Sequence, residues 1–451
     1  MTPSDFDFTS NAMKLLYILL LFAPCGILNA QIVTIPDANF KIALIEEGVD
    51  TNGDGEIQVA EAEEVIDLDV SAENIGSLEG IQSFINLVIL KCNANQLNTL
   101  DVTQNIVLEE LICAGNPLTS LDVTQNILLK TLSCSNELTS LDVTQNLMLE
   151  TLRCGSNQLQ SLDLTQNTNL VTLFCYSNQL TGLDITQNIN LEQLWCFDNP
   201  LNTLDLTLNS NLKRVWCSNN QLTSLNVTQN LQLESLLCHN NQLSTLDISQ
   251  NLELETLECS TNEFTSLDVS PNLNLSYFYC GGNQLSTLDL RSNSNLDWLG
   301  CFDNELTSLF LNNGNNHNMS AMISFNNPDL ICIQVDDETV SYPECGGLPL
   351  EGWCIDEWTF YSEKCTLGLN DSESISVSLH PNPVENVLNF SSPNHEVLLV
   401  TMYSVDGKEV GQFNSKGEGI KEIDISSFES GIYFLKLFFY GGQTVKRIIK
   451  K

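Results

Sequence analysis

The sequence predicts a β-rich repeat solenoid with a small helical cap at its N-terminal end and an antiparallel β-sandwich domain at its C-terminal end. Three observations indicate this architecture. Eleven cysteines recur with a near-constant period, apolar residues hold fixed places within each period, and the composition changes near Leu367. The chain of 451 residues has room for two or three domains of roughly 100–200 residues each.

The repeat is defined by cysteines that lie 21 residues apart at every step except the 20-residue step from Cys134 to Cys154. In a typical unit, residues 108–128 (LEELICAGNPLTSLDVTQNIL), inward Leu and Cys alternate with outward side chains. One coil cannot bury its own apolar face, whereas stacked coils share a continuous core. A fixed period of this length therefore predicts a solenoid. The cysteines are Cys92, Cys113, Cys134, Cys154, Cys175, Cys196, Cys217, Cys238, Cys259, Cys280 and Cys301.

Each unit contains the pattern L-x-x-L-x-C-x-x-N-x-L, with cysteine where a leucine-rich repeat normally has its third leucine. Over residues 65–330 the chain therefore resembles the leucine-rich repeat family. The second half of each unit, L-x-x-L-D-V-x-x-N, nearly repeats the first half, which predicts two extended segments per coil, one on each side. We expect the turn asparagines, such as Asn116, to bond backbone groups that a coil leaves unpaired.

The cysteines of the repeats have two possible states. In an exported protein, even numbers of cysteines usually form disulfides. Neighbouring cysteines here would lie one coil apart, about 4.8 Å, whereas the Cβ atoms of a relaxed disulfide are about 3.8 Å apart. We therefore expect buried thiols that act as small hydrophobes.

Four further cysteines lie in residues 331–366, an irregular segment after the last repeat. A terminal segment has to shield the open end of the core, and disulfides suit such a small cap. Four cysteines allow three pairings. We expect Cys332 to pair with Cys365 and Cys345 to pair with Cys354.

The N-terminal cap, residues 31–64, is expected to contain a helix that runs from an N-cap at Asp37 to Glu47. After it, residues 50–61 (DTNGDGEIQVAE) match the pattern D-x-[DN]-x-[DN]-G-x5-E. This segment resembles an EF-hand or dockerin-type loop, which implies a structural calcium ion. The alternative is an acidic turn without a metal. The implied ligands are Asp50, Asn52, Asp54, the carbonyl of Glu56, Gln58 through water, and Glu61.

The positions that flank each cysteine point outward, and several of them carry aromatic side chains. His239 and Glu258 interrupt this set. Adjacent exposed aromatic rings form an apolar platform of the kind that marks recognition sites, and ring faces also suit stacking on sugars. The alternative is cross-strand packing that only stiffens the sheet. The residues expected to bind a ligand are Phe174, Tyr176, Trp195, Phe197, Trp216, Tyr277, Tyr279, Trp298 and Phe302.

A column of aspartates is expected to face outward on the other side of the coils. Like charges one coil apart repel each other, unless nearby hydroxyl and amide groups bond to the carboxylates. The column is therefore either a hydrogen-bonded solvated face or a row of cation sites. Its members are Asp101, Asp122, Asp142, Asp163, Asp184, Asp205, Asp247, Asp268 and Asp289, with Asn226 as an interruption.

Both ends of the chain carry targeting signals. Residues 1–30 are expected to be a leader and signal peptide, because Lys14 precedes an apolar run that is too short to span a bilayer. After a linker at residues 367–374, residues 375–451 show short strands separated by turn residues, which predicts a small antiparallel β-sandwich. The segments that carry a resemblance to the type IX secretion C-terminal sorting domain are Pro381-Asn382-Pro383, Asp406-Gly407, Gly431-Ile432-Tyr433 and the basic residues 446–451. That resemblance implies contact with the secretion machinery, export across an outer membrane, and release or surface attachment of the remainder.

The net charge of −40 argues against nucleic acid as a partner, and the four scattered histidines argue against a histidine-based catalytic or zinc site. We therefore expect a non-enzymatic recognition protein, secreted or at the outer cell surface and without a transmembrane segment. It would bind a protein or glycan ligand through its concave face. The alternatives are a structural spacer without a discrete ligand and a glycan-active enzyme that uses paired carboxylates.

Overall fold

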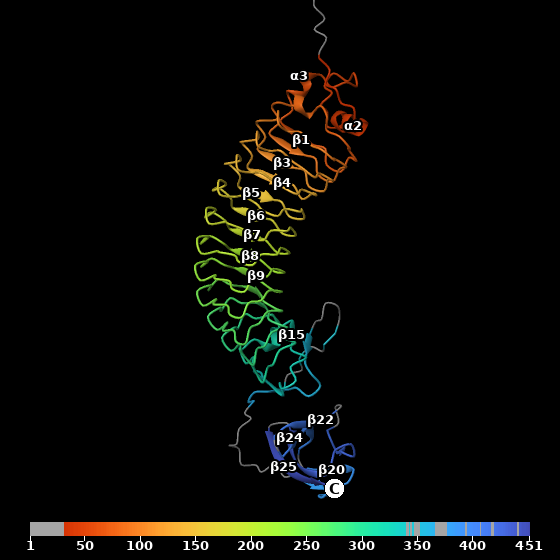
Figure 1. Cartoon of the computed structure of the whole chain (residues 1–451), viewed down its shortest axis with the longest axis vertical. Coiled ribbons are helices and arrows are strands. Elements are labelled where there is room, and N and C mark those ends of the chain that lie inside the picture. Colours follow the sequence, from red (N-terminus) through yellow and green to blue (C-terminus); the bar gives the residue numbers. More distant parts are fainter. Residues whose placement is uncertain are drawn as a thin grey trace, which may run out of the picture. The chain divides into compact units, whose positions relative to one another are not determined.

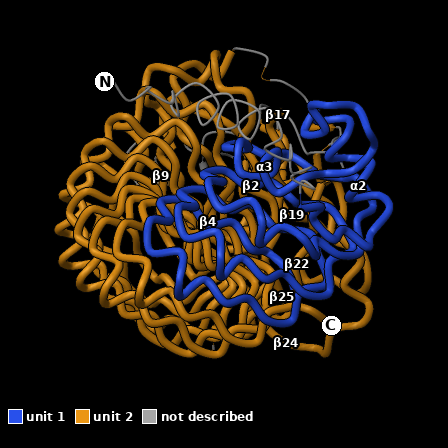
Figure 2. Tube along the Cα trace, turned by 90° about the horizontal axis from the view of Figure 1, so that it is seen from above, with its two compact units in different colours: residues 1–136 blue, residues 137–451 orange. Residues whose placement is uncertain are grey.

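A computed structural model describes most of the chain. The signal peptide and the linker predicted from the sequence lie outside the described residues. The chain divides into two compact units, residues 1–136 and residues 137–451 (Figure 2). The described residues are 31–339, 342, 345–346, 352–365, 377–392, 395–405, 407–415, 419–439 and 442–451.

Unit 1 consists of a helical cap followed by parallel coils (Figure 1). Asp37 is the N-cap of the first helix, as predicted, because its Oδ1 accepts hydrogen bonds from the N–H groups of Asn39 and Phe40. Its Oδ2 accepts bonds from the N–H groups of Gly76 and Ser77, so one carboxylate starts the helix and fixes it to a later turn of the chain. The elements of unit 1 are α2 (Ala38–Glu46), α3 (Val59–Ala62), β1 (Asp67–Asp69), the 3₁₀ turn η1 (Ile81–Ser83), β2 (Ile89–Lys91), β3 (Glu110–Ile112) and β4 (Thr131–Ser133).

The solenoid part of unit 2 is built around a parallel sheet on one side of its coils. Its strands, in spatial order, are β5 (Thr151–Arg153), β6 (Thr172–Phe174), β7 (Gln193–Trp195), β8 (Arg214–Trp216), β9 (Ser235–Leu237), β10 (Thr256–Glu258), β11 (Tyr277–Tyr279), β13 (Trp298–Gly300), β15 (Ala321–Ile323) and β17 (Gly352–Cys354). A 3₁₀ turn, η2 (Asn316–Asn318), precedes β15. Glu110 pairs with Thr131 in unit 1 and Thr172 pairs with Gln193 in unit 2, each 21 residues further along. The predicted 21-residue coil is therefore confirmed in both units.

The second extended segment of each coil forms regular strands only in the last coils of the described solenoid. There it makes a second parallel sheet. In an earlier coil the equivalent segments of Asp205 and Asn226 form an isolated bridge. The strands of the second sheet are β12 (Thr287–Asp289), β14 (Ser308–Phe310), β16 (Cys332–Gln334) and β18 (Phe360–Ser362).

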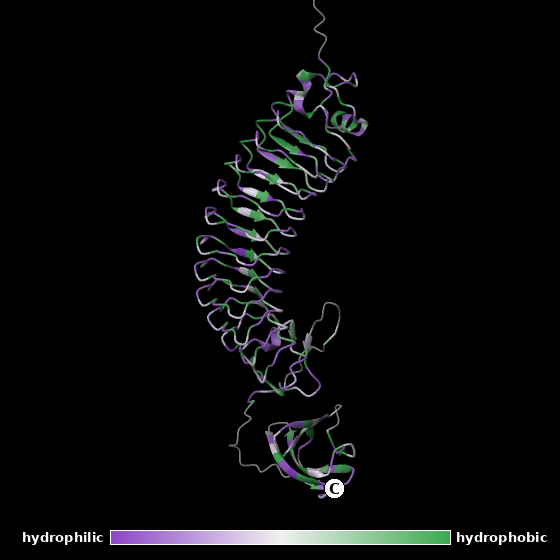
Figure 3. Cartoon of the chain, viewed as in Figure 1, coloured by the Kyte–Doolittle hydropathy of each residue, from purple (hydrophilic) through white to green (hydrophobic). Residues whose placement is uncertain are grey.

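Leucine and cysteine columns form the solenoid core, and the apolar and polar residues alternate along each coil (Figure 3). All eleven cysteines of the repeats are buried thiols, as expected. Burial raises the pKa of Cys113, Cys154, Cys217 and Cys301 to about 12. The thiols are therefore protonated in the core and behave as small apolar groups.

A column of buried asparagines joins each coil to its neighbour. The Nδ2 group of Asn199 donates hydrogen bonds to the carbonyls of Cys175 and Cys196, at 3.1 and 3.2 Å. Its Oδ1 accepts a bond of 3.0 Å from the backbone N–H of Leu180. One side chain thus satisfies backbone groups of two coils, which is the role expected for Asn116 and its equivalents.

The four cysteines beyond the repeats form the two expected disulfides, Cys332–Cys365 and Cys345–Cys354. Cys332 lies in β16 and Cys354 lies in β17. The bridges therefore attach surrounding segments to the last strand of the first sheet and to the next-to-last strand of the second sheet, near the end of the core.

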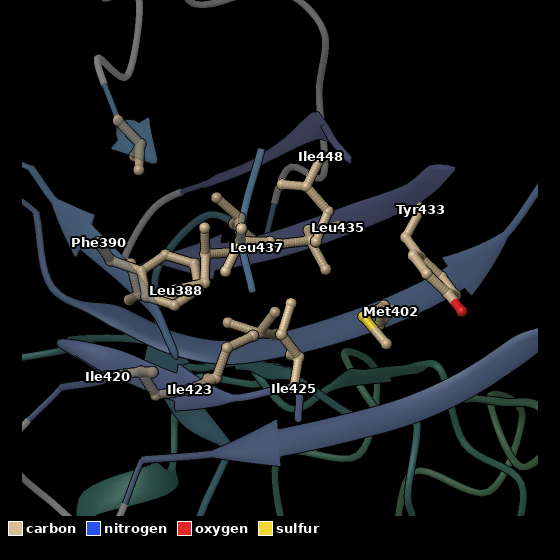
Figure 4. Packing of buried hydrophobic residues seen from close by; sticks show 14 of the residues in the cluster. Leu388, Phe390, Met402, Ile420, Ile423, Ile425, Tyr433, Leu435, Leu437 and Ile448 are labelled. Carbon is tan, nitrogen blue, oxygen red and sulfur yellow. The ribbon is translucent and has the colours of Figure 1, made fainter. Parts of the chain in front are cut away.

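The C-terminal domain is the predicted antiparallel β-sandwich, in which two sheets share one apolar core (Figure 4). Along β24, Leu435 and Leu437 point into this core, whereas Ile432 and Phe434 are partly exposed. The alternation explains why one face of the strand packs on the opposite sheet. The strands are β19 (Ser378–His380), β20 (Val387–Ser391) and β23 (Glu422–Asp424) in one sheet, and β22 (Glu409–Asn414), β21 (Val397–Ser404), β24 (Gly431–Phe439) and β25 (Gly442–Lys450) in the other.

Candidate functional site

The candidate site lies on the strand face, which we define as the outward side of strands β5 to β15 and of the residues that directly follow them. Alternation along β7 places Leu194 and Cys196 in the core and Trp195 and Phe197 on this face. The same alternation in neighbouring coils brings all nine predicted ligand-binding residues to this side, in two groups. Each of the nine side chains is partly buried.

The first aromatic cluster consists of Phe174, Tyr176, Trp195, Phe197 and Trp216. The ring of Trp195 stacks between the rings of Phe174 and Trp216, with centroid distances of 3.9 and 4.1 Å and nearly parallel planes. Tyr176 stacks on Phe197 at 4.7 Å in the neighbouring column. The rings therefore cover each other's faces, and the sequence-based expectation of an open platform of ring faces differs from this arrangement.

One end of each stack is also covered. The Arg153 guanidinium lies 5.5 Å from the centroid of Phe174, in a cation–π contact. Tyr176 lies over Gly155, where a Cβ atom would come within 2.7 Å of the ring. Any larger residue at position 155 would displace the ring, so this glycine fixes the orientation of Tyr176. The cluster thus presents ring edges in a fixed arrangement.

The indole N–H groups of Trp195, Trp216 and Trp298 are buried and donate no hydrogen bond within the described part of the chain. The exposed edges of these tryptophans therefore carry C–H groups, whereas the hydroxyls of Tyr176, Tyr277 and Tyr279 are hydrogen-bond donors of the two clusters. The tryptophan edges suit apolar contact with a partner.

The second aromatic cluster consists of Tyr277, Tyr279, Trp298, Phe302 and Phe325. Tyr277 contacts Tyr279 and Trp298 at centroid distances of 6.0 and 6.1 Å, and Phe302 stacks on Phe325 at 5.3 Å. The sequence analysis missed Phe325, because Ser324 occupies the place of the next cysteine and the step to that coil is 23 residues. Extending the leucine pattern beyond the last cysteine would have found it.

Between the clusters lies a segment of the strand face that we call the intercluster gap, formed by Leu237, His239, Glu258 and Ser260. The Nδ1 atom of His239 lies 3.2 Å from Oε1 of Glu258 and 3.0 Å from the hydroxyl of Ser218. Both side chains of the His239–Glu258 pair are about one-quarter exposed. Residues that seemed only to interrupt the aromatic set therefore form a polar centre between its two halves.

The aspartate column on the other side of the coils is a hydrogen-bonded face. In a typical coil, Oδ1 of Asp184 accepts hydrogen bonds from the hydroxyl and the backbone N–H of Thr186, at 2.7 and 3.0 Å. These bonds lower the pKa of Asp184. Equivalent bonds lower the pKa of Asp163 and Asp205. A shallow groove of about 750 Å³ runs along this side, across the coils around Gly182.

The calcium loop predicted from the sequence is folded around its own hydrogen bonds. Oδ1 of Asp50 accepts bonds from the N–H groups of Gly53 and Asp54, and Oε1 of Glu61 accepts three bonds, from Thr51 and Asn52.

The other predicted ligands of this loop bond to each other. Oδ1 of Asp54 accepts a bond from the N–H of Glu56, and Asp54 also accepts bonds from the amide of Gln58. Within the described residues, no three Asp, Glu, His or Cys side chains are grouped so as to hold a metal ion.

The tail matches a known family. Residues 378–451 match the family described as the secretion system C-terminal sorting domain. The domain implies interaction with a secretion machinery and places the protein outside the cell, secreted or attached to the surface. No helix within the described ranges has the length and apolar character that crossing a membrane requires.

The fold is similar to solved bacterial leucine-rich repeat structures over part of the chain, whereas no curated protein matches the sequence. The functional domain of InlJ from Listeria monocytogenes, which includes a cysteine ladder, is 23% identical, with a TM-score of 0.53, and the match covers 88% of this chain and 93% of that one. The leucine-rich repeat protein LIC12759 from Leptospira interrogans is 28% identical, with a TM-score of 0.52 and coverages of 56% and 69%. The internalin InlF from Listeria monocytogenes is 21% identical, with a TM-score of 0.55 and coverages of 67% and 91%.

The coils and the tail together define the class of this protein. It is a leucine-rich repeat solenoid with a cysteine ladder in its core. It is also an exported protein, because its last residues form a secretion sorting domain.

Proposed function

We propose that this protein binds a protein ligand at the cell surface through the aromatic clusters of its strand face. The observation that carries this proposal is the edge-on stacking of Phe174, Trp195 and Trp216. Rings that are stacked and partly buried lose little conformational entropy on binding, because they are already ordered. Clusters of aromatic side chains in such settings contribute most of the binding energy in protein interfaces.

The ring geometry favours a protein over a glycan. Sugar stacking needs an open ring face, but the faces of Trp195 are covered by Phe174 and Trp216. The buried indole N–H groups leave apolar edges on Trp195, Trp216 and Trp298, which fit aliphatic and aromatic side chains of a partner. A glycan ligand remains the second candidate on the other side of the coils, where hydroxyl groups and aspartates line the groove around Gly182.

Two alternatives from the sequence receive less support. A glycan-active enzyme needs one carboxylic acid with a raised pKa as proton donor, whereas hydrogen bonds lower the pKa of Asp163, Asp184 and Asp205. A spacer without a ligand would not need two aromatic clusters confined to one part of the strand face.

Replacing both Trp195 and Trp216 with alanine is expected to weaken binding to the protein ligand by about ten- to hundredfold, because both anchors of the first cluster are lost. The ligand is first identified by screening residues 31–451 on arrays of surface proteins and glycans. The dissociation constants of the native protein and the double variant are then compared by surface plasmon resonance.

The matched control is Asp184→Asn, which changes the opposite side of the coils and should leave binding of the protein ligand unchanged. Loss of ring stacking lowers stability by about 0.5–1.5 kcal/mol per pair, so circular dichroism has to show that the double variant is still folded. Unaltered affinity of a folded double variant would contradict the proposal.

Calcium binding by residues 50–61 stays a prediction from the sequence pattern. If the loop binds calcium, the melting temperature of the N-terminal cap rises when calcium replaces a chelator, and Asp54→Ala abolishes that rise. Isothermal titration with calcium measures the same site directly. Identical melting in calcium and in chelator, with no heat of binding, would show that the loop is an acidic turn held by its own hydrogen bonds.

A further inference from the structure

Aromatic rings border the intercluster gap on both sides. On one side, Trp216 is stacked on Trp195. On the other side, Tyr279 lies over Gly300, where a Cβ atom would come within 2.2 Å of the ring. Glu258 pairs with Tyr279 on the side away from Gly300, so the ring lies toward Gly300 and leans away from the carboxylate.

Glu258 is a partly buried carboxylate in aromatic surroundings. Its ion-pair partner is His239, which carries a charge only when it is protonated. Burial and then the negative charge of Glu258 raise the pKa of both Tyr277 and Tyr279, which places the carboxylate within electrostatic reach of both rings. A carboxylate beside aromatic rings is suited to hold a cation, because the ring quadrupole and the negative charge both attract it.

We propose that the intercluster gap receives a lysine or arginine side chain of the protein ligand, held by Glu258 and the ring of Tyr279. This inference rests on the proposed function of the strand face and names the chemistry of its partner. A protein with a net charge of −40 attracts basic partners over long distances, and Glu258 gives that attraction a specific place.

The spacing of the gap defines the partner segment further. Trp216, Leu237, Glu258 and Tyr279 occupy equivalent places in four successive strands. Three strand spacings amount to about 14 Å, which equals the rise of about four residues of an extended chain. Position 3 of an extended segment that runs along the solenoid, with apolar residues at positions 1 and 5, falls between the levels of Leu237 and Glu258. A long basic side chain at that position would share the face of the two apolar residues and could reach Glu258.

The test uses two labelled peptides, acetyl-Phe-Ser-Arg-Ser-Phe amide and the same peptide with citrulline in place of arginine. Citrulline keeps the shape of arginine but has no charge. Fluorescence anisotropy with residues 31–451 is expected to show about tenfold tighter binding of the arginine peptide at pH 7.5. Glu258→Gln should bind both peptides equally, whereas Glu255→Gln, an equal change of charge on an exposed neighbour, should keep the preference.

The Trp195→Ala/Trp216→Ala variant should bind both peptides more weakly than the native protein does. Equal binding of the two peptides, no binding of either, or an unchanged preference in Glu258→Gln would overturn the inference. If both peptides bind equally but still depend on the tryptophans, the charge site fails while the proposed function stands. If the tryptophan variant binds both peptides like the native protein, the proposed function itself fails.

Discussion

Replacing Asn199 with alanine is expected to lower the free energy of unfolding of the solenoid by about 2–4 kcal/mol. The substitution leaves the buried Leu180 N–H without its partner. It also removes one of the two amide donors of each of the Cys175 and Cys196 carbonyls, which keep their bonds from Asn178 and Asn220. A buried backbone group without a partner costs about 1–3 kcal/mol, each lost hydrogen bond adds about 0.5–1.5 kcal/mol, and the costs are not fully additive. Because a solenoid is stabilised by contacts between neighbouring coils, the damage is expected to stay local.

Urea unfolding gives the change in stability, and native-state hydrogen exchange of the Leu180 amide shows whether the loss is at this coil. The matched control is Asn209→Ala, in the second buried asparagine column. Its Nδ2 donates to the carbonyls of Ile185 and Asn188, but its Oδ1 has no partner within the described part of the chain. Removing the Asn209 side chain also removes an unpaired acceptor. The free energy of unfolding is therefore expected to fall by only about 1–2 kcal/mol. Equal losses of stability in Asn199→Ala and Asn209→Ala would show that the asparagine column of Asn199 stabilises the coils no more than the second column does.

Replacing both Cys332 and Cys365 with serine removes their disulfide and is expected to lower the free energy of unfolding by about 3–4 kcal/mol. The bridge closes a loop of 33 residues, and the chain-entropy estimate for a loop of that size is of this order. The cost arises mainly because the unfolded chain gains freedom. Since Cys332 lies in β16, the last coils of the second sheet should open first.

The internal comparison is the Cys345–Cys354 disulfide, which closes a loop of only 9 residues. The same entropy argument predicts a smaller loss, about 2–3 kcal/mol, when this pair is replaced by serine. Thermal melting of both double variants, with limited proteolysis to locate the first cleavage, measures the order of the two effects. A larger loss for the shorter loop would show that the bridges act through native contacts rather than through loop closure.

The repeat pattern of the sequence was sufficient to predict the coils, the buried thiols and the outward aromatic residues. A 21-residue period places equivalent residues side by side, and alternation along a strand then decides which of them face the core. The two disulfides were also expected, because the cysteines beyond the repeats lie in a short capping segment.

The arrangement of the aromatic side chains could not be predicted from the pattern alone. Alternation gives the side of the sheet on which Trp195 lies, but not the rotamer that stacks it between Phe174 and Trp216. The role of Gly300 beneath Tyr279 depends on a contact between two coils, and glycine in one strand gives no local signal for it. The calcium-loop pattern likewise does not show that the Glu61 carboxylate accepts hydrogen bonds from the backbone N–H groups of Thr51 and Asn52.

The measurement that tests this account most directly is hydrogen exchange of residues 31–451 with and without the identified protein ligand. Bound ligand is expected to protect the backbone of strands β6 to β13, from the first aromatic cluster across the intercluster gap to the second. The aspartate column should exchange as it does in the free protein. Protection confined to the coils around Gly182, with no change on the strand face, would contradict the account.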